Sequence, residues 1–347
     1  MLPCRVTGRV SGLLLVLSAL LSLAACSSPP ESHVLQGQAL GTYWSVRMVM
    51  PEQARATEGL RSEIEDALEL VDRQMSTWRE DSDLSRFNQL EAGQSMEIPE
   101  AFAHVLETAL DIAELSDGHF DPTIGPLVNL WGFGPEGRRS EPPPEDEIEQ
   151  ALQRVDWRRL DYDPDTRRLT QPGDAYLDFS GIAKGFAAEL VAERLMERGI
   201  EHFIVDLGGD MVVRGQRPDG TPWRIAIERP EPDTRDIFSV IEVRDRALVT
   251  SGSYRNYFEY GETSFSHTID PHIGRPIPEE LVSVTVVHDD CTVADALATA
   301  ITAMGADEGY RFARENELAA LLLVIDGDSV AERMTEAFAG YLPQEEY

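Results

Sequence analysis

The chain has 347 residues, of which 62 are acidic and 30 basic, so its formal net charge at pH 7 is −32. A protein of this charge repels a phosphate backbone, which excludes nucleic-acid binding from the function classes. Its hydrophobic content of 42% is that of an ordinary globular protein with a real core. Any ligand that carries phosphate must bind where a cation or local basic groups reverse the field.

The N-terminal residues have the pattern of a secretory signal peptide. Arg5 and Arg9 precede an apolar run over 13–23, which is too short for a typical membrane-spanning helix. The run ends in Leu-Ala-Ala-Cys, which resembles the lipobox of bacterial lipoproteins, and the next four residues, Ser-Ser-Pro-Pro, suit a flexible tether. We therefore expect Cys26 to be lipidated.

The expected organisation follows from this start. It is a signal peptide over 1–25, a lipidated tether over 26–36 and one domain over 37–342, on the periplasmic side of the cell envelope. Which membrane holds the anchor stays open. Once Cys4 leaves with the signal peptide and Cys26 is acylated, Cys291 is the only thiol, so no internal disulfide is expected.

The first half of the domain is predicted to mix strands and helices. Apolar alternation over 33–50 predicts a strand pair or a bent strand with Gly41 in its middle. Helical spacing of apolar residues predicts amphipathic helices over 53–75 and 101–115, with a polar loop over 76–88 between them. Pro144 begins a short helix with an acidic first turn.

The second half continues the mixture. We predict helices over 181–198, 292–304 and 330–338, and strands over 202–206, 210–214, 222–228, 238–243, 246–250, 282–287 and 319–325. The elements show no regular βαβ rhythm, so the predicted fold class is α+β, a mixed α/β fold.

One candidate site lies over 178–185, at a predicted strand-to-helix junction. The free N–H groups and partial positive charge of a helix start hold anions, and Gly181 and Gly185 allow a ligand to approach closely. An ordinary helix entry capped by Ser180 fits the same residues. The stretch is neither a G-x-G-x-x-G motif nor a Walker loop.

A second candidate is the pair Asp295 and Thr299. They are four residues apart in a predicted helix, so their oxygens share one face and can both reach a hard cation. The alternative is structural: Thr292-x-x-Asp295 also fits an N-terminal capping box, which would occupy the carboxylate.

A third candidate is the stretch 250–276, which holds His267, Asp270, Arg255 and Arg275. Histidine acts as an acid or a base near neutral pH, although a lone histidine also serves structural roles. The sequence has no H-E-x-x-H or paired Cys/His spacing, so its spacing predicts no zinc site. The segment 117–134 is rich in glycine and aromatic residues, which suits either a wrap around a planar ring or a tightly turned core segment.

In this order, these segments resemble the ApbE family, the FAD:protein FMN transferases. The matching pieces span about residues 39–305, nearly the whole mature chain. They are 40–42, 76–78, 118–121, 125–134, 178–185, 205–210, 250–256, 266–276 and 294–299. Leu40 departs from the family pattern, in which methionine is frequent, and Trp78 stands where tyrosine is frequent.

The resemblance implies a two-lobed fold with FAD in a cleft between the lobes and one divalent ion, usually Mg²⁺, at its pyrophosphate. By position, the metal ligands would be the backbone carbonyl of Gly181 with Asp295 and Thr299, and His267 would be the catalytic histidine. The resemblance also implies a set of residues that line the FAD site: Leu40, Trp78, His119, Phe120, Asp121, Asp178, Lys184 and Ile269.

The implied reaction is Mg²⁺-dependent transfer of FMN from FAD to a threonine or serine hydroxyl of an acceptor flavoprotein, with release of AMP. The implied acceptors are subunits of Na⁺-translocating NADH:quinone reductase or Rnf-type complexes, and the chain would meet the membrane through its lipid anchor. Two alternatives remain open at this point: an FAD pyrophosphatase that gives FMN and AMP, and a non-catalytic FAD-binding lipoprotein.

Overall fold

The computed structural model describes residues 32–343 except 51–57, 138, 140, 231–235, 253–256, 261, 262, 279 and 328. The expected signal peptide, Cys26 and Arg255 lie outside the described residues. None of the described helices combines the length and apolar character needed to cross a membrane. The first strand begins at Ser32, inside the range expected for the tether.

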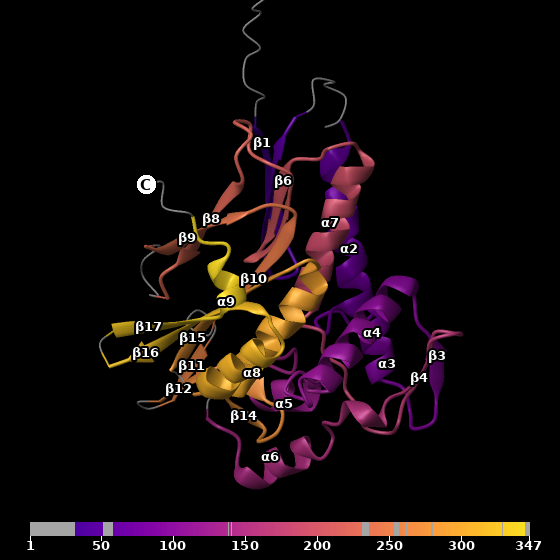
Figure 1. Cartoon of the computed structure of the whole chain (residues 1–347). Helices are drawn as coiled ribbons and strands as arrows, with labels where there is room; N and C mark the ends of the chain where they lie inside the picture. Colours follow the sequence, from indigo (N-terminus) through magenta and orange to yellow (C-terminus); the bar gives the residue numbers. More distant parts are fainter. Residues whose placement is uncertain are drawn as a thin grey trace, which may run out of the picture.

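An eight-stranded antiparallel sheet forms the centre of the molecule (Figure 1). Strand β15 (Leu281–His288) is buried along almost its whole length, because both faces of the sheet are covered. In spatial order the others are β1 (Ser32–Ala39), β2 (Thr42–Val49), β6 (Phe203–Leu207), β7 (Asp210–Arg214), β10 (Arg246–Gly252), then β15, β16 (Ala319–Asp326) and β17 (Ser329–Met334).

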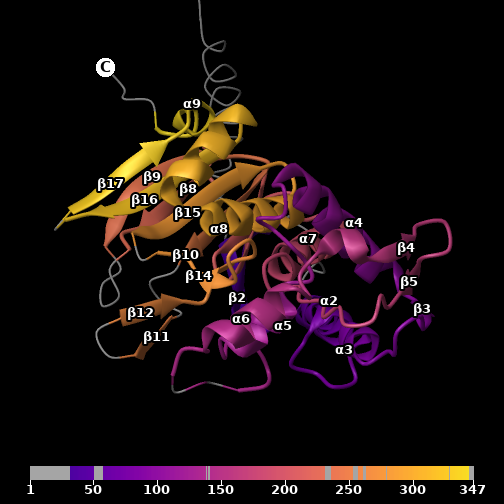
Figure 2. The ribbon, with the colours of Figure 1, turned by 90° about the horizontal axis from the view of Figure 1, so that it is seen from below.

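Helices cover one face of this sheet and a hairpin covers the other (Figure 2). The helices α2 (Leu60–Met75), α4 (Glu100–Leu115), α7 (Ala183–Glu197) and α8 (Cys291–Glu315) share the largest hydrophobic core with the sheet. The opposite face packs against β8 (Trp223–Glu228), β9 (Ile237–Val243) and α9 (Glu336–Ala339). The result is a layered α+β domain, as predicted.

A smaller lobe packs around a separate hydrophobic cluster that contains Leu127, Trp131, Ile148 and Ile269. The Trp131 indole N–H donates to the Gly274 carbonyl oxygen at 2.8 Å, which ties the end of α5 (Gly125–Leu130) to the turn between β13 (Ile269–Asp270) and β14 (Arg275–Pro276). The lobe includes α5 (Gly125–Leu130), α6 (Glu145–Leu152), β11 (Tyr257–Tyr260), β12 (Thr263–Ser266), β13 (Ile269–Asp270) and β14 (Arg275–Pro276).

The remaining short elements lie between α2 and α7 in the sequence. They are α3 (Asp83–Asn88), β3 (Ser95–Glu97), η1 (Trp157–Arg159), β4 (Asp161–Asp163) and β5 (Arg168–Thr170). The polar loop predicted over 76–88 therefore contains a helix. Its start is fixed by the Ser82 hydroxyl, which accepts a hydrogen bond from the Ser85 N–H at 2.9 Å.

One other prediction differs from the structure. The helix predicted over 330–338 is wrong, because Ser329–Met334 pair with β16 as strand β17 and only a short helix follows. The strand pair predicted over 33–50 is confirmed as a hairpin, with Gly41 in its two-residue turn. Leu40 and Gly41 have φ values of 51° and 73° in that turn, which is unusual for leucine.

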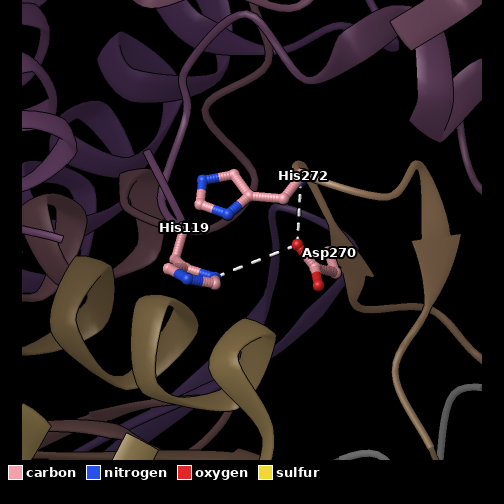
Figure 3. A group of neighbouring side chains, drawn as sticks. All are labelled: His119, Asp270 and His272. Atoms are coloured by element: carbon pink, nitrogen blue, oxygen red, sulfur yellow. Dashed lines mark hydrogen bonds and ion pairs between the residues drawn. The ribbon is translucent and has the colours of Figure 1, made fainter. Parts of the chain in front are cut away.

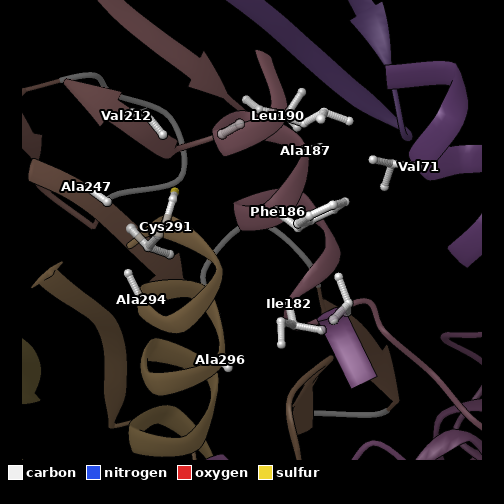
Figure 4. Close-up of a cluster of buried hydrophobic side chains, with 14 of the residues drawn as sticks. Val71, Ile182, Phe186, Ala187, Leu190, Val212, Ala247, Cys291, Ala294 and Ala296 are labelled. Carbon is white, nitrogen blue, oxygen red and sulfur yellow. The ribbon is translucent and has the colours of Figure 1, made fainter. Parts of the chain in front are cut away.

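Helices α7 and α8 meet where glycine and small side chains allow close contact (Figure 4). A Cβ atom at Gly185 would overlap the Cys291 carbonyl oxygen and lie 2.8 Å from Asp295 Cβ. Buried Ala294 and Ala296 follow on α8, and Cys291 is a buried free thiol. This contact fixes the first half of α8 against the start of α7.

We expect Gly185→Ala to lower the free energy of unfolding by about 1–3 kcal/mol, because the added methyl group forces the two helices apart. Urea denaturation measures this change. Gly340→Ala is the matched control, since a Cβ there meets its nearest atom, the Ala337 carbonyl oxygen, at 3.5 Å. Equal unfolding midpoints for the two variants would contradict the close contact.

Candidate functional site

A cavity of about 1370 Å³ lies between the two lobes. Its lining comes from the β1–β2 turn, α2 and the loop after it, the segment before α5, the start of α7, the β6–β7 turn, β8, β10, the β12–β13 connection and α8. All residues predicted for catalysis, flavin binding or metal binding line this one cavity: Leu40, Trp78, His119, Phe120, Asp121, Asp178, Gly181, Lys184, His267, Ile269, Asp295 and Thr299.

Three oxygen donors come together on the α7–α8 side of the cavity. The Thr299 hydroxyl donates to the Gly181 carbonyl oxygen at 3.2 Å. Only glycine fits at 181, because a Cβ there would lie 2.9 Å from the Thr299 methyl group. Asp295 lies one helical turn before Thr299 and is buried. A carbonyl, a hydroxyl and a carboxylate are the hard donors that Mg²⁺ prefers, so these residues fit that ion.

The Asp295 carboxylate is held by its neighbours on α7. It accepts a hydrogen bond from the Gly185 N–H at 3.0 Å and lies 3.4 Å from Lys184 Nζ. Lys184 Nζ lies closer to a second buried carboxylate, Asp210 at the start of β7, at 2.7 Å. Two buried carboxylates therefore share one ammonium group, which leaves excess negative charge where a cation would be stabilised.

The pKa shifts agree with this charge balance. Burial and the Asp295 carboxylate raise the pKa of Asp210, while Lys184 partly opposes the shift. Burial alone would lower the pKa of Lys184, but the Asp210 and Asp295 carboxylates outweigh it and raise that pKa. Lys184 therefore stays protonated. Asp210 was part of a matching segment, but sequence reasoning gave it no role, because its contact with Lys184 joins distant elements.

Neither structural alternative holds, whether the capping box at Thr292 and Asp295 or the helix entry capped by Ser180. Helix α8 begins at Cys291 and is capped by Asp290, whose carboxylate accepts from the Val293 N–H at 3.0 Å, so no Thr292-based capping box occupies Asp295. Helix α7 begins at Ala183 without a side-chain cap. Ser180 does not cap it, and instead donates its backbone N–H to the Asp178 carboxylate at 2.8 Å.

Two buried aspartates support the walls of the cavity. Asp121 accepts from the Thr123 N–H at 2.7 Å and from the Trp157 N–H at 3.1 Å. Burial raises the pKa of Asp121 and of Asp178, and their hydrogen bonds oppose the shift. These hydrogen bonds fix the backbone next to Asp121 and next to Asp178, the two places where these aspartates line the cavity.

His267 lines the same cavity and lies in the connection between β12 and β13. Its ring meets Phe133 edge-on, with centroids 6.4 Å apart. Arg275, a member of the third candidate stretch, forms an ion pair with Glu145 of α6 and is not among the described residues that line the cavity. Among the described residues that line the cavity, Lys184 supplies the positive charge.

Trp78 offers an aromatic face at the cavity wall, because 69% of its surface is exposed. If a ring of FAD stacks on it, Trp78→Ala should cost about 1–3 kcal/mol, or roughly 5- to 150-fold in Kd for FAD. Fluorescence titration with FAD measures this. Trp78→Tyr keeps an aromatic face and should bind nearly as well as the wild type. Unchanged affinity in the alanine variant would mean that Trp78 does not stack.

The chain is similar to known proteins of one family. The ApbE family matches residues 40–322. A relative from Vibrio cholerae called FAD:protein FMN transferase is 39% identical over 95% of this chain and 98% of its own length, and one from Escherichia coli of the same name is 33% identical over 95% and 97%.

Solved structures agree. The flavin transferase ApbE of V. cholerae superposes with a TM-score of 0.83 at 37% identity, covering 90% of this chain and all of the other. The Pseudomonas stutzeri flavinyl transferase ApbE in its apo form also gives 0.83, at 36% identity, over 90% and 97% of the two chains.

Proposed function

The chain belongs to the ApbE family, and from this we propose that it is an FAD:protein FMN transferase. The observation that carries the proposal is the single cavity that brings the oxygen donors of α7 and α8 and the imidazole of His267 to one space. A threonine or serine hydroxyl of the acceptor attacks the FMN-side phosphorus of FAD. The bond from that phosphorus to the bridging oxygen breaks, and AMP leaves with the electron pair.

The metal of this reaction is proposed to be Mg²⁺, held by the Gly181 carbonyl oxygen, Thr299 and Asp295. When bound, such an ion neutralises pyrophosphate charge and stabilises the leaving group. The chain's own part is to keep these three donors fixed. The close contact of Gly185 with α8 and the hydrogen bond from its N–H to Asp295 do so before any ligand arrives.

His267 is proposed to accept the proton of the attacking hydroxyl. General-base catalysis of this kind contributes roughly 10²–10⁴-fold. Lys184 stays charged beside the buried carboxylates and offsets part of the negative field that FAD meets on entry. Leu40, Phe120 and Ile269 give the same cavity apolar surface for the rings of FAD.

The cellular setting is part of the proposal. The lipobox-like sequence before Cys26 supports a signal peptide over 1–25, a lipid anchor at Cys26 and one domain that ends near residue 342. We place the chain on the periplasmic side of the envelope. Its acceptors would be flavoprotein subunits of Na⁺-translocating NADH:quinone reductase or Rnf-type complexes, which favour the inner membrane.

The test is to incubate the purified protein with FAD, Mg²⁺ and a candidate acceptor subunit. We expect in-gel flavin fluorescence of the acceptor and a mass increase equal to one FMN, with one AMP released per transfer. Omitting the acceptor separates the alternatives. AMP formed at the same rate without acceptor would indicate an FAD pyrophosphatase, and stoichiometric FAD that never turns over in any arm would indicate a binding protein.

A further inference from the structure

Two histidines and an aspartate that lie far apart in the sequence meet beside the cavity (Figure 3). His119 follows α4, Asp270 ends β13, and His272 lies in the β13–β14 turn. Each side chain offers one ligand atom, and these three atoms lie within 4.8 Å of one another. The two imidazole rings are 4.1 Å apart between centroids.

The hydrogen bonds around His272 prepare one of its nitrogens for a metal. Its Nε2 lies 2.9 Å from the Asp117 carbonyl oxygen. Because a carbonyl oxygen only accepts hydrogen bonds, Nε2 carries a proton, and in the neutral imidazole Nδ1 then has a free lone pair. The His272 backbone N–H also donates to the Asp270 carboxylate at 2.8 Å, which orients that carboxylate. Hydrogen bonds of this kind orient metal-binding side chains.

His119 supplies an independent observation. Its side chain is only 11% exposed, and its Nδ1 is buried without a hydrogen-bond partner among the described residues. The nearest carboxylate oxygen, Asp270 Oδ1, is 3.9 Å from Nδ1, which is too far for a hydrogen bond. A buried polar atom left unpaired costs about 1–3 kcal/mol. A metal ion between His119 and Asp270 would give this nitrogen its partner.

We propose that His119, Asp270 and His272 bind a divalent transition-metal ion of the zinc class. Two imidazoles and one carboxylate suit Zn²⁺, whereas Mg²⁺ prefers oxygen ligands such as those of Gly181, Asp295 and Thr299. Zinc–ligand bonds of about 2.0–2.2 Å place tetrahedral ligands roughly 3.4 Å apart, so binding draws the three side chains together. The exposed position of His272 permits this movement. Three protein ligands leave a fourth position for water.

The test is calorimetric titration of the metal-free, full-length protein with ZnSO₄ at saturating Mg²⁺. We expect one zinc equivalent in the wild type. His272→Ala and Asp270→Asn should each weaken zinc affinity by at least about tenfold, since each removes a ligand. His33→Ala removes an exposed histidine of β1 and should bind zinc like the wild type. Asp295→Asn should also keep zinc binding, because it alters only the oxygen site.

Visible absorption of the Co²⁺-substituted protein gives a second readout. The wild type should show d–d bands that disappear in His272→Ala, and His272→Cys should restore them with an added thiolate charge-transfer band. Circular dichroism confirms that each variant is folded. No zinc binding by the wild type at saturating Mg²⁺, full affinity in His272→Ala, or loss of zinc in Asp295→Asn alone would each overturn the proposal.

Discussion

Asp295→Asn should reduce Mg²⁺-dependent FMN transfer by roughly 10²–10³-fold or more while the protein stays folded. Of the three proposed metal ligands, Gly181, Asp295 and Thr299, only Asp295 is charged. The substitution therefore removes the main attraction of this site for a cation. Transfer to an acceptor protein over a series of Mg²⁺ concentrations measures the effect, and the residual activity should no longer respond to Mg²⁺.

The same variant has a stability readout that separates chemistry from folding. The asparagine oxygen can still accept from the Gly185 N–H, and Lys184 then faces one buried carboxylate instead of two. We therefore expect the free energy of unfolding to stay equal or to rise. Asp307→Asn, at an exposed position later on α8, is the control and should keep full transfer. Wild-type Mg²⁺-dependent transfer in Asp295→Asn would refute the metal site.

His267→Ala should slow transfer by roughly 10²–10⁴-fold and leave the Kd for FAD nearly unchanged. The reason is that a base for the acceptor hydroxyl acts in the chemical step and contributes little to the binding of FAD. Single-turnover transfer with preformed protein–FAD complex measures the chemical step, and fluorescence titration measures binding.

Two comparisons give this second prediction its control. His33→Ala lies on β1, outside the described cavity lining, and should transfer FMN at the wild-type rate. Addition of imidazole to the His267→Ala reaction should recover part of the rate if the side chain acts as a base. An undiminished rate, or a loss explained entirely by weaker FAD binding, would exclude this role.

Local patterns predicted much of the fold. Strand β7 has the predicted bounds, and α4 begins one residue earlier than expected, because short apolar periods determine both elements. The helix predicted over 330–338 was wrong because of a tertiary contact. Val330 and Met334 fit a helical period, yet pairing with the edge of β16 determines their structure. The predicted end of the helix over 292–304 is confirmed, because non-helical backbone at Gly305 kinks α8 there and separates its first helical part from its second.

For the site, too, local patterns predicted some residues, and contacts between distant segments determined the others. Asp295 and Thr299 were found from their spacing on one helix, and their joint position at the cavity is a local consequence of that helix. Lys184–Asp210 and His119–His272 could not be found in this way, since each pair joins segments that are neighbours only in the folded chain. No local period reports such contacts.

The tip of the β1–β2 hairpin shows a compromise between stability and ligand contact. A two-residue turn in which both residues have positive φ is most easily formed by Asn-Gly, and leucine in this conformation costs of order 1 kcal/mol. Leu40 nevertheless places its apolar side chain on the cavity wall. A sequence optimised only for thermal resistance would discard this leucine, so attempts to engineer a more heat-tolerant transferase should leave the hairpin tip untouched.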